Sequence, residues 1–305
     1  MSRDFTPQEA EVPGRRDRPL ERGPVDRSER RTESPDQGWH LDDPGNLPDP
    51  QRDPPIASQE SEQRLLLSDG DRDHRLTALQ IRIMTDLGKF RVIARNALLK
   101  SVAAIGGKSP VGGVEDLVRD GLLRSETFEG PEGAPRELLT LTKPGRHLLR
   151  LNRLVSGEQA IYCGFVKPRE ANHDADIYPL FEKEAARIET AGGRVRRVIL
   201  DFELRREVNR ERARLGKEAQ PEIAAHYGLT VVCDKIPLPD LQIEYVTQEG
   251  DLARVNLELV TEHYRGRHVG EKARAGFSLY TPRGEGNKLR RILDQHELTA
   301  EILSL

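Results

Sequence analysis

Two acidic residues stand on either side of a predicted turn: Asp240 in "PDLQIEY" and Glu258 in "VNLELV". Each lies about nine residues from Glu249 and Gly250, so a hairpin turning there would pair their neighbourhoods. Pro239 cannot donate a hydrogen bond to a sheet, which predicts that a strand starts just after it. The two carboxylates are therefore expected to converge at one end of the hairpin.

Such a carboxylate pair suits Mg²⁺, which takes oxygen ligands and keeps several of its waters. The ion polarises a phosphoryl oxygen and activates its bound water, as metal-dependent nucleases require. Lys272, in "VGEKARAGF", is predicted on a following helix, where its ammonium would neutralise developing charge. Asp240 and Glu258 are the candidate metal ligands and, with Lys272, the candidate catalytic residues; Tyr264 and His268 are further polar candidates. Alternatively, Glu258 simply faces solvent on an alternating strand.

Other acidic side chains leave alternative sites open. If a different strand carries the site or a helix adds a ligand, the candidates are Asp201 and Glu203 in "VILDFEL", and Glu182 and Glu184 on a predicted helix. Glutamates on such a helix are more often solvated surface residues than metal ligands. His226 and Cys233 flank the strand before the hairpin, and a lone His or Cys is more often a packed residue than a ligand.

Composition separates an N-terminal tail from the rest of the chain. Residues 1–60 hold half of the prolines, with nine Lys and Arg against fourteen Asp and Glu. A segment so poor in apolar residues cannot offset its backbone entropy, so disorder is expected over residues 1–70. Trp39 could be a docking motif, although an isolated aromatic in such a tail more often has no role. The remainder is slightly basic and contains Arg and Lys clusters that can bind phosphates.

Several protein classes are not expected. The N-terminus shows no signal sequence, and no apolar run approaches the roughly 18 residues that a membrane span needs. Cys163 and Cys233 form neither a disulfide framework nor a zinc spacing. A soluble, cytoplasmic protein without a membrane partner is therefore expected.

Residues 74–152 show the order of a winged helix-turn-helix. Apolar residues at helical spacing predict helices over 76–88, 91–105 and 111–123. Two alternating runs, 122–129 and 137–145, then flank the turn "GPEGAP" and predict a two-stranded wing. The third helix would enter the major groove. The candidate DNA-binding residues are Lys108, Ser109, Arg119, Arg124, Arg136, Lys143 and Arg146. Winged helices also mediate dimerisation and protein docking, and this third helix is not strongly basic.

Residues 160–305 read as a second, mixed domain. Helices are expected from His173, over 205–215, near 221–227, over 270–281 and over 287–303, with strands at 194–204 and in the hairpin. The fold class is therefore α+β or α/β: a winged helix followed by an α/β domain with a small mixed sheet.

The ordered combination of these motifs resembles the replication-relaxation family of plasmid and mobile-element proteins. That resemblance covers roughly 74–300, through "IPLPDLQIEY" and "VNLELVTEHYRGRHVGEKARAGFSLY". It implies a restriction-endonuclease-like domain of the PD-(D/E)xK type, preceded by a winged helix and a helix that begins near His173. Asp240, Glu258 and Lys272 match the motif positions. Val260 stands where a nuclease strand holds Lys, which leaves Mg²⁺-dependent cleavage or nicking open.

Three functions follow as hypotheses. The first is a DNA-binding protein of a plasmid or mobile element, acting in replication initiation or DNA relaxation on duplex DNA. The second is a winged-helix transcriptional regulator with an inactive nuclease fold. The third is an adaptor that binds only proteins, such as replication or conjugation factors, through its acidic tail.

Overall fold

The computed structural model describes residues 64–103, 110–130, 133–165, 167–260, 266–281, 286–295 and 302–304. All of them belong to one unit, Ser58–Leu305. The expected tail over 1–60, including Trp39, lies outside the described residues, as does Tyr264.

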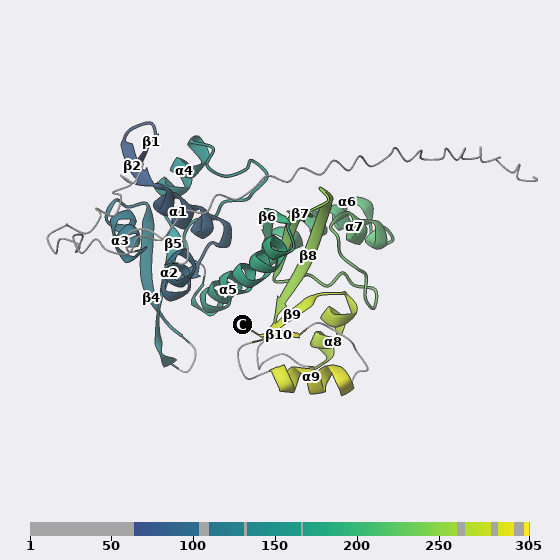
Figure 1. Ribbon diagram of the computed structural model, residues 1–305. Helices are drawn as coiled ribbons and strands as arrows, with labels where there is room; N and C mark the ends of the chain where they lie inside the picture. The colour runs from purple at the N-terminus through teal and green to yellow at the C-terminus, as the bar shows by residue number, and fades with distance from the viewer. Residues whose placement is uncertain are drawn as a thin grey trace, which may run out of the picture. The chain divides into compact units, whose positions relative to one another are not determined.

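The described residues from 64 to 152 form helices and two small antiparallel sheets (Figure 1). The elements are β1 (Arg64–Ser68), β2 (Asp73–Thr77), α1 (Ala78–Phe90), β3 (Ile93–Ala94), α2 (Arg95–Ala103), α3 (Pro110–Arg119), β4 (Leu123–Glu129), β5 (Pro135–Leu141) and α4 (Lys143–Leu151). Strands β1 and β2 pair with each other, and β5 lies between β3 and β4. Thr77 begins α1 with a capping box, its hydroxyl accepting from the N–H of Gln80 at 3.2 Å.

Two features here differ from the sequence expectation. Strand β1 lies within residues 1–70, where a tail was expected, because its partner β2 gives this short apolar run a place in a hairpin. Strand β3 takes the first residues of the helix expected over 91–105 and pairs with β5, so the sheet has three strands rather than two.

Gly88 was expected to end the first helix but lies inside α1, which continues to Phe90. A Cβ on Gly88 would come within 2.8 Å of Ile161 Cγ2 and 3.1 Å of Leu141 Cδ1. The glycine is therefore explained by close packing, and the helix ends instead where Arg91 takes a positive φ of 65°.

Residues 168–304 form a five-stranded sheet with helices on both faces. The elements are α5 (Pro168–Thr190), β6 (Arg194–Leu200), α6 (Asp201–Leu215), α7 (Gln220–His226), β7 (Leu241–Val246), β8 (Leu252–Leu259), α8 (Gly266–Arg274), β9 (Ser278–Thr281), α9 (Gly286–Gln295) and β10 (Ile302–Ser304). The strand order is β10-β9-β8-β7-β6; β6, β7 and β8 are antiparallel, and β9 and β10 add in parallel. The chain is thus a mixed α+β protein.

The expected hairpin is confirmed. Strands β7 and β8 pair from Leu241 opposite Leu257 to Val246 opposite Leu252. The turn between them contains Gly250 at a φ of 93°, a conformation that glycine adopts without steric cost.

Three other segments were assigned wrongly. The strand expected over 194–204 ends at Leu200, and α6 begins at Asp201, where acidic residues favour the first turn of a helix. The helix expected over 270–281 ends at Arg274, and 278–281 form β9. The last helix stops at Gln295, and 302–304 form β10.

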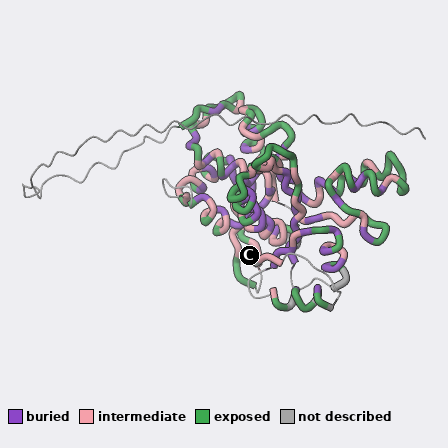
Figure 2. The backbone as a smooth tube through the Cα atoms, turned by 45° about the vertical axis from the view of Figure 1, so that its right-hand side comes forward, coloured by how far each residue is buried: buried purple, intermediate pink, exposed green. Residues whose placement is uncertain are grey.

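Helix α5 covers one face of the sheet with Ile177, Leu180 and Phe181, which join a core shared with α1. On the other face, α6, α7, α8 and α9 pack around a second core that includes Ile199 and Leu279. Figure 2 shows the buried residues of these cores inside and the exposed residues on the outer helix turns. None of the described helices has the length and apolarity that crossing a membrane requires.

Candidate functional site

Asp240 and Glu258 meet at one end of the β7–β8 hairpin. The backbone N–H of Asp240 donates to Glu258 Oε2 at 3.2 Å, and the N–H of Leu259 donates to Asp240 Oδ2 at 2.9 Å. This reciprocal pairing follows from the strand register, which brings Leu241 opposite Leu257. The structure therefore brings these two predicted residues together.

Lys272 reaches the same point from α8. Its Nζ lies 2.8 Å from Glu258 Oε1 and also donates to the carbonyl oxygen of Leu238, just before Asp240. The Glu258 side chain is 0% exposed, so this ion pair is buried on the carboxylate side. The amine expected from the helix after the hairpin is thus in place.

Helix α5 adds a second cation, His173. Its Nε2 lies 3.3 Å from Asp240 Oδ1. The hydrogen bond to Asp240 outweighs the opposing effect of burial and raises the pKa of His173 from 6.5 to about 9. The imidazole is therefore protonated at neutral pH.

Asp174, the next residue on α5, is an acidic neighbour that sequence reasoning missed. Burial raises its pKa from 3.8 to about 6, against the attraction of Arg91 and His173 and with added repulsion from Asp201. Asp201 starts α6 and its N–H donates to the carbonyl oxygen of Asp240 at 3.2 Å. The sequence signal for Asp174 was its place next to His173. Whether Asp174 comes near Asp240 depends on how α5 crosses the sheet, which the sequence does not specify.

The two carboxylates of the hairpin each pair with a cation. Asp240 and Glu258 carry two formal negative charges, and Lys272 and protonated His173 carry two positive ones. A Mg²⁺ site needs carboxylate oxygens with room for the waters of the ion. Here Glu258 has no exposed surface, and Asp240 is only 13% exposed. Among the described residues, no group of three or more His, Cys, Asp or Glu is placed to hold a metal. A Mg²⁺ ion would have to displace His173 and Lys272 from the two carboxylates.

Comparison of the chain with protein-family models, curated proteins and solved structures gives no match.

The remaining acidic candidates have structural partners. Asp201 and Glu203 do not alternate on a strand, because both lie in the first turn of α6. Glu203 is buried, accepts from Tyr162 Oη at 2.5 Å and pairs with Arg197. This pairing satisfies Glu203 inside the core and sets it apart from the Asp240 centre.

On α5, Glu182 accepts from Ser101, and buried Glu184 accepts from Tyr280 Oη at 2.6 Å. Both glutamates were expected to be solvated surface residues, yet each accepts a hydrogen bond from a residue of another helix or strand. They hold α5 in place and do not add a ligand to Asp240.

The other polar candidates do not join the site. His268 is exposed and lies 3.9 Å from Glu271, and His226 and Cys233 are exposed as well. Val260, at the position expected to hold Lys in a nuclease strand, is buried in the second core. Lys272 is thus the residue whose ammonium fills the space next to Glu258.

The candidate DNA-binding residues fall into three groups. Lys108 and Ser109 lie outside the described residues. Three arginines pair with carboxylates: Arg119 with Asp116, Arg124 with Glu126, and Arg136 with Asp176. Lys143 and Arg146 lie on α4, the first exposed and the second half-buried.

Arg136 serves to hold α5 in place. It donates to Asp176 Oδ1 at 2.7 Å and to the carbonyl oxygen of Asn172 at 3.3 Å, while Asn172 Nδ2 donates to the carbonyl oxygen of Glu129 at 2.7 Å. These bonds join strands β4 and β5 to the helix that carries His173. Arg136 is therefore committed to an internal contact.

Proposed function

We propose that this chain is a duplex-DNA-binding protein of the replication-relaxation type, from a plasmid or mobile element. Residues 74–152 would act as a winged helix and 160–305 as a restriction-endonuclease-like domain that no longer cleaves. The order α1, β3, α2, α3, β4, β5, with β5 between β3 and β4, supports the winged helix. A role in replication initiation or DNA relaxation, with replication or conjugation proteins as partners, would follow from the resemblance.

The pairing of the two carboxylates with cations of the protein carries the second part of the proposal. Asp240 before β7, Glu258 in β8 and Lys272 in α8 follow the order of the nuclease motif. Their charges, however, are neutralised within the protein by Lys272 and His173. We infer that this centre fastens the end of the hairpin to α5 and α8 and that the domain is retained for binding.

Duplex binding is tested by fluorescence anisotropy over a range of salt concentrations. The logarithm of the binding constant should fall linearly with the logarithm of the salt concentration, because each neutralised phosphate releases counterions. Absence of binding at low salt, or binding that salt leaves unchanged, would rule out this function and favour a protein-binding adaptor.

A second candidate is a Mg²⁺-dependent nickase that uses Asp240, Glu258 and Lys272. The convergence of these residues favours it, although their neutralised state does not. Incubating supercoiled plasmid with Mg²⁺ or Mn²⁺ separates the two candidates. The proposal expects no nicking by the wild type. Nicking that is lost in both Asp240→Ala and Glu258→Ala, but kept in the control Asp251→Ala in the hairpin turn, would establish the nickase instead.

A further inference from the structure

Helix α4 has two opposite faces. Gly145, Leu148 and Leu149 are buried against the rest of the protein. At 3.6 residues per turn, the opposite side presents a different set. That set consists of Lys143, Arg146, His147 and Arg150. We call these residues, with Arg153 just after the helix, the α4 basic stripe.

The α4 basic stripe differs from several other arginines in its ion pairing. Within the described part of the chain, none of its members lies in salt-bridge contact with a carboxylate, whereas Arg119, Arg124 and Arg136 each do. External phosphates could therefore approach the stripe without displacing an existing partner. This distinguishes the α4 basic stripe from Arg119, Arg124 and Arg136.

At its N-terminus, α4 carries a charge that opposes what a helix favours by itself. Its first turn contains Lys143 and no acidic residue. The N-terminus of a helix carries a partial positive charge, so a cation there is unfavourable by a few tenths of a kcal/mol to about 1 kcal/mol. The same partial charge adds to that of the side chains and strengthens attraction for an anion.

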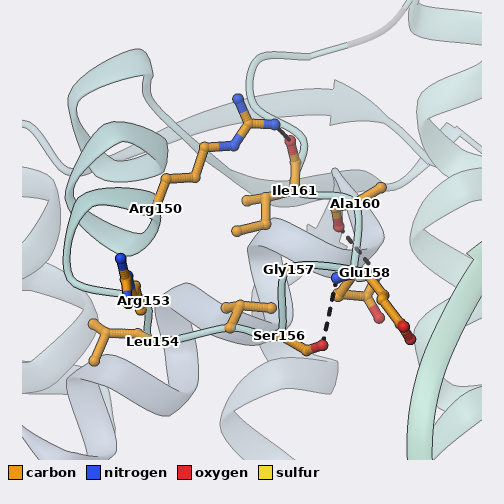
Figure 3. A pocket seen from close by; sticks show the side chains of 10 residues that line it. Arg150, Arg153, Leu154, Ser156, Gly157, Glu158, Ala160 and Ile161 are labelled. Carbon is orange, nitrogen blue, oxygen red and sulfur yellow. Dashed lines mark hydrogen bonds between the residues drawn. The ribbon is translucent and has the colours of Figure 1, made fainter.

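The stripe ends at a hollow of about 720 Å³. Arg150, Arg153 and the loop 154–161 line it, and Figure 3 shows Arg153 on one side and Glu158 on the other. Arg150 Nη2 lies 3.5 Å from the carbonyl oxygen of Ile161. Glu158 is the acidic residue among those lining the hollow, and it pairs with Arg196. The hollow is thus suited to a phosphate group.

Helix α3, which a winged helix would place in the major groove, has the opposite character. It carries Glu115 and Asp116, and Asp120 follows it directly. Its one arginine, Arg119, is paired with Asp116 at 2.6 Å. A phosphate backbone would meet a predominantly acidic surface there.

We propose that the phosphate backbone of duplex DNA lies along the α4 basic stripe, rather than against α3, with one phosphate in the hollow at Arg150 and Arg153. This inference rests on the proposed duplex-binding function. Lys143 to Arg150 spans about 10 Å of helix, enough for two or three neighbouring phosphates.

The test compares two variants with the same change of charge. One carries Lys143→Gln, Arg146→Gln and Arg150→Gln on α4, and the control carries Arg205→Gln, Arg212→Gln and Arg214→Gln on α6. Anisotropy titrations of a labelled duplex give the dissociation constant and its salt dependence. The α4 variant should bind about tenfold more weakly or worse, with a salt slope shallower by about 3, while the control stays near the wild type. Circular dichroism checks that both remain folded.

The possible outcomes distinguish a failure of the proposed duplex-DNA binding from a failure of the α4 basic stripe. Failure of the wild type to bind duplex DNA defeats the proposed function itself. Wild-type binding that the α4 variant retains, or that the α6 control loses to the same extent, overturns the stripe alone. If the triple α4 variant does not fold, Arg153→Gln outside the helix replaces it, with a slope shallower by about 1 expected and an unchanged slope counting against the stripe.

Discussion

Asp240 and Glu258 each bind the backbone of the other's strand. Glu258 Oε2 accepts from the N–H of Asp240 at 3.2 Å, and Asp240 Oδ2 accepts from the N–H of Leu259 at 2.9 Å. Lys272 pairs with Glu258 from α8, which follows the hairpin in sequence. His173 pairs with Asp240 from α5, which precedes it. The centre therefore ties the hairpin to α8, which follows it, and to α5, which is far from it in sequence.

Removal of the ammonium of Lys272 should destabilise the fold strongly. Lys272→Met removes the ammonium that lies 2.8 Å from the buried Glu258 Oε1, and the free energy of unfolding should fall by about 3–5 kcal/mol. The double variant Lys272→Met with Glu258→Gln removes both charges and should recover much of that loss. Urea denaturation at pH 7 measures this, with Arg205→Gln as a control at an exposed pair. A single-variant loss below about 0.5 kcal/mol would contradict the buried pair.

The His173–Asp240 pair predicts a particular pH dependence. The pKa of His173 rises to about 9 in the folded state, above the ordinary 6.5. Its stabilisation should therefore be complete below pH 6.5 and lost as the pH rises through 9. His173→Gln should be less stable than the wild type at pH 6 and equal to it near pH 10.

Titration of the His173 ring by NMR checks the cause. Its midpoint should lie near 9 in the wild type and fall in Asp240→Asn, where the charged acceptor is lost. Asp251→Asn, in the exposed hairpin turn, should leave the midpoint where it was. A midpoint that Asp240→Asn does not move would show that another group holds the proton.

The hairpin could be predicted because its signals are local. Pro239 marks the start, alternation marks the strands, and Gly250 marks the turn, so counting residues gave the approximate pairing of Asp240 with Glu258. Strand β9 was missed although Gly276, at a φ of 79°, separates it from α8. A strand of four residues forms because it pairs with its neighbour β8. That pairing cannot be recognised from the local sequence pattern.

The rest of the centre depends on contacts between distant residues. His173 and Asp240 are 67 positions apart, and no local pattern specifies that α5 crosses the sheet at their level. Gly88 was misread for the same reason, because a glycine near a predicted helix end favours termination unless a distant side chain needs its space. The pairing of both carboxylates with His173 and Lys272 became visible only with α5 and α8 in place.

Two helical glycines should respond to alanine in opposite directions. At Gly88, a methyl group would meet Ile161 Cγ2 at 2.8 Å, and overpacking of a core costs about 1–3 kcal/mol. At Gly112, in α3, nothing lies within 4 Å of the new Cβ, so Gly112→Ala should gain about 0.5–1 kcal/mol of helix propensity. Chemical denaturation of the two single variants measures both effects. A Gly88→Ala protein as stable as Gly112→Ala would show that the contact with Ile161 relaxes freely.

The hydroxyl of Tyr178 joins α5 to the first half of the chain. Tyr178 Oη lies 3.1 Å from Asp86 Oδ2 and 3.0 Å from Ser101 Oγ, and the side chain of Asp86 is fully buried. Tyr178→Phe keeps the packing of the ring but leaves this buried carboxylate with one donor fewer, which should cost about 1–3 kcal/mol.

Tyr245→Phe is the matched control, since in the described part of the chain the Tyr245 hydroxyl has no recorded hydrogen bond. Urea denaturation should separate the two variants by at least about 1 kcal/mol. Because α5 also carries His173, the ring titration of His173 in Tyr178→Phe reports whether the helix stays in position. An unchanged midpoint together with the stability loss would assign Tyr178 to the joint between the two halves alone, whereas equal stability of the two variants would show that the buried hydroxyl is dispensable.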